Sequence, residues 1–148
     1  MLTIGRILFA ALFIVSGASK LLELAATTQE ISTKVVIPAF LTTYTGQLES
    51  AAEMPIAQIL AIAAGTIELV CGLLIALNFG ARFFAIILVL FVGFATFYFH
   101  NFWDMAAGAE RTNNMIHALK NLSLIGGLFM VAGLPRFSRQ AETAYSDA

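Results

Sequence analysis

Three charged side chains stand inside long apolar stretches of the sequence: Lys20, Glu68 and Lys120. Two histidines, His100 and His117, lie near the ends of two further apolar stretches. A charged group surrounded by apolar sequence is costly to bury and needs a partner. Lysine and histidine donate hydrogen bonds to carbonyls or anions, and histidine and glutamate carry protons in catalysis. These residue types predict a site that holds an anion or an electron-rich carbonyl and handles protons.

The neighbours of these residues at helical spacing are small or polar. Ser16 lies four residues before Lys20, and Glu68 shares its face with Gly65, Gly72 and Ala76. Small residues at this spacing let helix backbones approach closely, so Glu68 is predicted to point into a helix bundle.

A polar stripe also runs along the sequence around His117. In a helix, Asn114, His117, Lys120 and Asn121 fall on one face, while Thr96, His100 and Trp103 follow one another on the preceding element. We expect catalytic roles for His117, Lys120 and Glu68. Substrate-binding roles are expected for Lys20, His100, Trp103, Asn114 and Asn121.

Each of these residues has an alternative interpretation. Lys20 and Lys120 would also fit a membrane if they extended their ammonium groups to the lipid headgroups. Glu68 would also fit as a neutral, hydrogen-bonded packing residue, and the histidines as interfacial residues beside Trp103. Haem ligation through His100 or His117 is a further alternative, but no third ligand of matching type is evident and no metal site is predicted.

The composition shows where these residues must be positioned. Of 148 residues, 59% are hydrophobic and 11% are charged, against about a quarter charged in an average soluble domain. Four segments reach the roughly 20 apolar residues that a membrane-spanning helix needs, at about 2–24, 56–77, 82–99 and 115–134. Lipid tolerates no open sheet edge, so we predict an all-α integral membrane protein, a four-helix transmembrane bundle. Residues 1–135 form its single domain, and 136–148 a polar cytoplasmic tail.

Charge and cysteine content exclude other classes. A net charge of −1 without a Lys/Arg cluster gives no surface for nucleic acid. The single cysteine, Cys71, lies in an apolar run and excludes an intrachain disulfide.

The connection between the first two spans, residues 25 to 54, is long for a structureless loop. Thr27 and Glu30 match a capping box that would open a short helix, and residues 35–41 are apolar enough for the membrane interface. The sequence leaves two interpretations: a short interfacial helix or lid, or packing over the end of the bundle.

Four spans place both termini on one side, together with the loop between the second and third spans. That side carries four arginines, whereas the other side has two basic residues in loops. The positive-inside rule then predicts that both termini are cytoplasmic. The polar residues at the opposite end would face the extracytoplasmic side. The arginines are Arg6, Arg82, Arg136 and Arg139.

Several short motifs, in this order and spacing, resemble the DoxX family of small bacterial membrane proteins. They are Gly5-Arg6-Ile7-Leu8 with Ser16-Gly17 and Lys20-Leu21, Glu68 with Gly72-Leu73-Leu74, Arg82, the run from Ala95 to Trp103, and the run from Asn114 to Leu122. The resemblance implies a four-helix protein of the bacterial inner membrane. The related DoxD protein is a subunit of a thiosulfate:quinone oxidoreductase, so the resemblance implies quinone-linked redox chemistry by analogy only. It supplies no settled catalytic residues.

Three functions remain open at this point. The first is a quinone-linked redox enzyme or subunit, in which the polar residues bind the quinone headgroup and handle its protons. The second is a non-enzymatic assembly subunit, whose polar stripe contacts a redox partner subunit or organises a homo-oligomer. The third is a small transporter.

Overall fold

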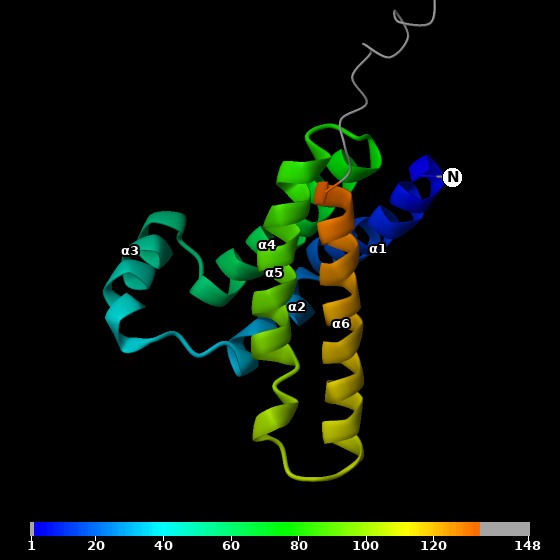
Figure 1. The fold of residues 1–148 in the computed structure, drawn as a ribbon. Coiled ribbons are helices and arrows are strands. Elements are labelled where there is room, and N and C mark those ends of the chain that lie inside the picture. The colour runs from blue at the N-terminus through cyan, green and yellow to red at the C-terminus, as the bar shows by residue number, and fades with distance from the viewer. Residues whose placement is uncertain (1, 134–148) are drawn as a thin grey trace, which may run out of the picture.

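The computed structural model describes residues 2–133, and all regular secondary structure in that range is helical. Four long helices cross the molecule, and shorter helices lie in the connections (Figure 1). The predicted all-α architecture is confirmed. The long helices are α1 (Leu2–Leu22), α4 (Ile56–Ala76), α5 (Ala81–Phe99) and α6 (Ala109–Gly133). The shorter ones are α2 (Leu24–Lys34), η1 (Ala39–Leu41), α3 (Thr42–Ala52) and η2 (Phe102–Asp104).

All four long helices are long and apolar enough to cross a membrane, as the hydropathy pattern predicts. A helix of 21 residues, such as α1 or α4, extends about 31 Å and matches a hydrocarbon core of about 30 Å. The chain is therefore a multi-pass membrane protein with four candidate spans. The predicted polar tail, residues 136–148, lies outside the described residues.

Local sequence explains the boundaries of the second and third spans. Pro55 precedes α4, where a missing N–H costs nothing. Asn78 and Gly80 both adopt left-handed backbone angles, with φ of 59° and 58°, which closes the tight hairpin between α4 and α5.

The last span begins earlier than the apolar run of the sequence predicts. Helix α6 starts at Ala109 rather than near residue 115. Its first turn is held by Thr112, whose backbone N–H and hydroxyl both donate to the Gly108 carbonyl. The helix therefore continues beyond the apolar run into the polar residues 109–114.

The long helices form two antiparallel pairs, α1 with α4 and α5 with α6, joined through the contact of α4 with α5. The α1/α4 pair runs obliquely to the α5/α6 pair (Figure 1). We call the end where α1 and α5 finish and where α4 and α6 begin the histidine end.

The two pairs share one apolar core toward the opposite end of the molecule. It includes Phe13, Ile75, Leu88 and Leu128, all with an exposed fraction of 2% or less. This core holds the two helix pairs together. At the histidine end, by contrast, the facing surfaces of the pairs carry polar side chains.

The connection between α1 and α4 contains helix, as predicted, but not the predicted capping box. Helix α2 already begins at Leu24, so Thr27 lies within it, and the Thr27 hydroxyl donates to the carbonyls of Lys20 and Glu23. The sequence does not distinguish a threonine whose hydroxyl donates to a carbonyl of the preceding turn from a threonine that caps the start of a helix. Helix α2 packs against α4, whereas α3 buries none of its residues.

Candidate functional site

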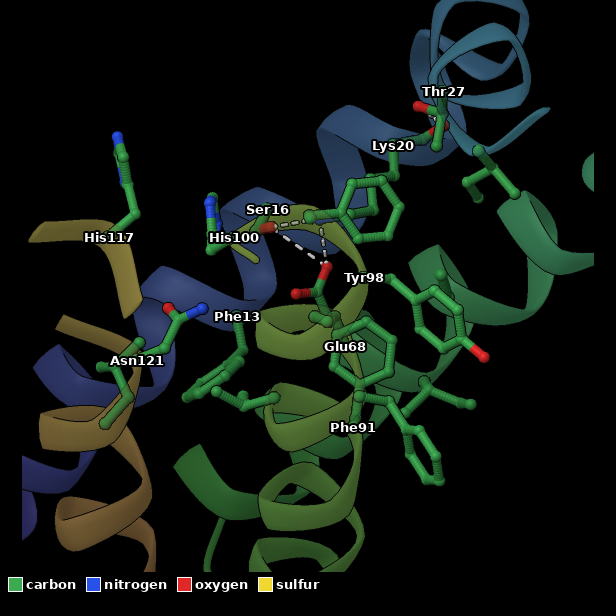
Figure 2. A pocket seen from close by; sticks show the side chains of 18 of the residues that line it. Phe13, Ser16, Lys20, Thr27, Glu68, Phe91, Tyr98, His100, His117 and Asn121 are labelled. Carbon is green, nitrogen blue, oxygen red and sulfur yellow. Dashed lines mark hydrogen bonds and ion pairs between the residues drawn. The ribbon is translucent and has the colours of Figure 1, made fainter. Parts of the chain in front are cut away.

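Lys20, Ser16 and Glu68 form a hydrogen-bonded triad between α1 and α4 (Figure 2). Lys20 Nζ lies 2.7 Å from Glu68 Oε2 and 2.6 Å from Ser16 Oγ, and Ser16 Oγ donates to the same carboxylate oxygen at 3.0 Å. The Glu68 side chain is 9% exposed and that of Lys20 is 32% exposed. Lys20 therefore pairs with Glu68 instead of extending to the headgroups, and Glu68 points into the bundle as predicted.

The triad depends on a very close crossing of α1 over α4. A Cβ atom on Gly17 would lie 2.5 Å from the Leu69 nitrogen and 2.7 Å from the Gly65 oxygen. A Cβ atom on Gly65 would meet the Leu21 side chain at 2.8 Å. The atoms near Gly17 are backbone atoms that cannot move aside, so only glycine fits there, and the small-residue face predicted for Glu68 is matched by Gly17 on α1.

A cavity of about 970 Å³ lies at the histidine end between the two helix pairs. Its size is at the upper end of the range for small-molecule sites, about 300–1,000 Å³. Phe13 and Val92 belong both to its wall and to the apolar core. The polar and ionisable side chains in its wall come from five helices or their ends: Ser16, Lys20, Thr27, Glu30, Glu68, Tyr98, His100, His117, Lys120, Asn121 and Ser123.

Six of the eight residues predicted for the site line this one cavity. They are Lys20, Glu68, His100, His117, Lys120 and Asn121. Segments far apart in sequence thus converge at one end of the molecule, as the alternating directions of the spans predict. Their catalytic and binding roles stay predictions.

Two predicted residues do not line the cavity. Trp103 lies on the short η2 helix, packs against Phe97 and Phe102, and is 46% exposed. The chain turns after His100, which carries the indole away from the cavity wall. Asn114 also stands outside the lining, but it contacts His100, which is in it.

The two histidine rings stack on each other, with centroids 5.0 Å apart and planes inclined by 12°. His100 follows α5 and His117 lies on α6, so the stack joins the two helices at the wall of the cavity.

The hydrogen bonds of Asn114 define the tautomer of His100. Asn114 Nδ2 donates to the Glu110 carbonyl at 3.1 Å, which turns Oδ1 toward His100 Nδ1 at 3.2 Å. An amide oxygen can only accept, so His100 Nδ1 carries the hydrogen and donates it. In the neutral ring, His100 Nε2 is then a free acceptor for a proton.

This tautomer gives a direct prediction. Replacing Asn114 by leucine removes the acceptor, and we expect neutral His100 to move its hydrogen toward Nε2. The chain has two histidines, so ¹⁵N chemical shifts of the labelled imidazoles report this change. The matched control is Asn113→Leu at the exposed neighbouring position, which should leave the His100 shifts unchanged. An unaltered His100 spectrum in Asn114→Leu would contradict the assignment.

Asn121 is held in the cavity wall by a short relay. Asn121 Nδ2 donates to Thr96 Oγ1 at 2.9 Å, and the Thr96 hydroxyl donates to the Val92 carbonyl at 2.7 Å. The relay fixes the amide orientation and leaves Asn121 Oδ1 and one N–H for a ligand.

Lys120 differs from Lys20 in having no ion pair or hydrogen bond among residues 2–133. It is exposed and lines the cavity. Because Lys20 is paired with Glu68, Lys120 is the lysine of the cavity wall that has no ion pair within residues 2–133. Glu30 on α2 is a second acid in the lining and is exposed.

Sequence reasoning missed the contribution of α2 to the cavity. Thr27, Glu30 and Ile31 line it, with Val35 just beyond the helix. Their spacing of three and four residues places Thr27, Glu30 and Ile31 on one helical face. This spacing could have indicated a helix face turned toward the cavity. Two of these residues, Thr27 and Glu30, are the ones that resemble a capping box in the sequence.

The described part of the chain contains no group of three or more His, Cys, Asp or Glu side chains arranged to hold a metal ion. The predicted alternative of haem on His100 or His117 is a different arrangement and stays untested.

Comparison with protein families shows which family the chain matches. The family model described as DoxX matches residues 1–101, which includes α1 through α5. No curated protein and no solved structure shows significant similarity to the chain. The matched range contains the Lys20–Ser16–Glu68 triad and His100, whereas His117, Lys120 and Asn121 lie beyond it.

Proposed function

The chain belongs to the DoxX family of membrane proteins, and from this premise we propose that it is a quinone-linked redox enzyme or enzyme subunit of a bacterial inner membrane. The cavity at the histidine end is the proposed site of the quinone headgroup. Following the positive-inside rule, we place both termini in the cytoplasm and the cavity toward the extracytoplasmic side.

The observation that carries the proposal is the contrast within this cavity. Its wall is mostly apolar and it lies between membrane-spanning helices, as suits a lipid-soluble ring. The same wall includes Lys120, Asn121 and the two stacked histidines. A quinone ring needs an apolar slot with hydrogen-bond donors at its carbonyl oxygens, and this set of groups fits that need.

The side chains divide into donors and proton acceptors. A bound quinone supplies two-electron chemistry coupled to protons. The unpaired Lys120 ammonium and the remaining Asn121 N–H are suited to donate to carbonyl oxygens. His100, with Nδ1–H held by Asn114, offers Nε2 to accept a proton, and the stacked His117 ring is the next proton carrier.

In this proposal Glu68 has a positioning role, whereas the sequence predicts a catalytic one. Its Oε2 atom already accepts from Lys20 and Ser16. We propose that Glu68 mainly positions Lys20 at the cavity wall. In this role it also cancels the charge of Lys20, so that Lys120 is the lysine without an ion pair in the described residues that can attract an electron-rich ligand.

The test is quinone binding to the purified protein. We expect quinone in an organic extract of the protein, and binding of a short-chain ubiquinone or menaquinone analogue by calorimetry. Lys120→Ala should weaken binding about tenfold, the effect of losing one hydrogen bond from a charged donor. The matched control, Lys34→Ala, changes an exposed lysine outside the cavity lining and should bind as wild type.

The other outcomes point to the alternatives. A preparation that holds no quinone, and binds none, contradicts the proposal. A Soret band in the visible spectrum would replace quinone by haem on His100 or His117. A stable second subunit recovered after mild crosslinking, without quinone binding, would favour the assembly role.

A further inference from the structure

The segment from the end of α2 to the end of α3 exposes four large apolar side chains, of which Tyr44 and Leu48 share one face of α3. Val36 is 77% exposed, Phe40 76%, Tyr44 65% and Leu48 52%. We call these four residues the apolar ridge. Figure 1 shows α3 standing apart from the four long helices. The ridge lies outside the four candidate spans, so its exposed apolar side chains are not part of a membrane-spanning helix.

Helix α3 is nevertheless tied to the bundle at one point. Glu49 Oε1 accepts a hydrogen bond of 2.7 Å from the backbone N–H of Ile56, the first residue of α4. The negative side chain thereby satisfies one free N–H at a helix start, a favourable position for an anion. This contact fixes α3 beside the beginning of α4.

The position of α4 identifies what covers the ridge. Since α4 is a candidate span of 21 residues, its first residue lies near a membrane–water boundary. The tie through Glu49 places α3 at that same level. Tyrosine and phenylalanine beside aliphatic residues suit this boundary, where one part of a ring is in lipid and the other is wet.

The polar groups of α3 are consistent with such a surface. The hydroxyls of Thr42, Thr45 and Ser50 donate to carbonyls of their own turn, so they are satisfied without water or a partner chain. The ridge itself carries no charge. A surface of this kind enters the headgroup–acyl boundary at little electrostatic cost.

From these observations we propose that the apolar ridge is a membrane-docking surface, inserted into the lipid of the leaflet in which α4 begins. The occupant is the bilayer rather than another protein. Val35 lines the cavity and Val36 begins the ridge. Docking of the ridge in lipid therefore anchors the chain segment that follows α2, whose residues form part of the cavity wall.

The test uses a single tryptophan as a reporter of lipid contact. Trp103 is the one tryptophan of the chain, so Trp103→Phe provides a silent background. We add Tyr44→Trp and reconstitute the full chain into phosphatidylcholine vesicles brominated near the headgroup end of the acyl chains. Emission should fall about twofold relative to unbrominated vesicles, since bromine quenches on contact and the ring sits at the acyl boundary.

The matched control is Thr43→Trp in the same background. Thr43 is exposed on another face of α3 and should show little quenching. Circular dichroism checks that both variants keep the wild-type helix content. If Tyr44→Trp is unquenched, or if both positions are quenched equally, the ridge is not a lipid-docking face and the proposal is overturned. Crosslinking between copies through Tyr44→Cys would then identify a second copy as the occupant. Neither result depends on quinone binding.

Discussion

Replacing Glu68 by leucine is expected to lower the free energy of unfolding by about 2–3 kcal/mol. The substitution keeps an apolar side chain of similar volume but leaves the Lys20 ammonium without its carboxylate in a site that is only partly reached by solvent. Breaking a buried ion pair by removing one partner is strongly destabilising, because the other charge stays desolvated. The 32% exposure of Lys20 moderates the loss. Thermal unfolding in detergent micelles, followed by circular dichroism, measures it.

The control for this prediction is the double variant. When Lys20→Met is combined with Glu68→Leu, no charge remains to be desolvated, and apolar replacement of a buried pair is often neutral. The double variant should therefore recover most of the stability that Glu68→Leu loses. If Glu68→Leu and the double variant unfold alike, the ion pair does not stabilise the α1/α4 contact.

The second large effect is expected from Gly17→Ala. The added methyl group would lie 2.5 Å from a backbone nitrogen and 2.7 Å from a backbone oxygen of α4, and neither atom is free to move aside. Helix α1 must then shift away from α4, which also stretches the Lys20–Glu68 contact at 2.7 Å. Overpacking of this kind costs about 3 kcal/mol.

Gly5 on the same helix is the matched control. A Cβ atom there meets nothing within 4 Å, so Gly5→Ala should unfold like wild type or slightly later, since alanine favours helix over glycine. Equal melting of Gly17→Ala and wild type would contradict the close crossing. A lower melting temperature for Gly17→Ala but not for Gly5→Ala confirms it.

Much of this protein follows from local sequence. The span lengths depend on runs of apolar residues, and the helix pattern follows because lipid requires every backbone group to be bonded within its own segment. The hairpin at Asn78 and Gly80 depends on residues that accept left-handed angles. Convergence of His100, His117 and Lys120 at one end follows from the alternating direction of successive spans.

Contacts between residues on different helices could not be predicted from local sequence in the same way. The sequence alone did not assign a partner to Glu68, and the crossing at Gly17 and Gly65 brings it to Lys20. Trp103 looks like part of the histidine stripe, but a short helix after His100 turns it outward.

The sequence by itself thus determined that this is a four-span membrane protein of the DoxX type and that its embedded charges gather at one end. These properties depend on apolar length and on spacing along single helices, which are local. The tertiary structure decided that Lys20 neutralises Glu68, that Lys120 is left to face the cavity, and that α2 completes its wall. The physical reason is that partner choice depends on how closely and at what angle helices cross, and that is set by packing between distant segments.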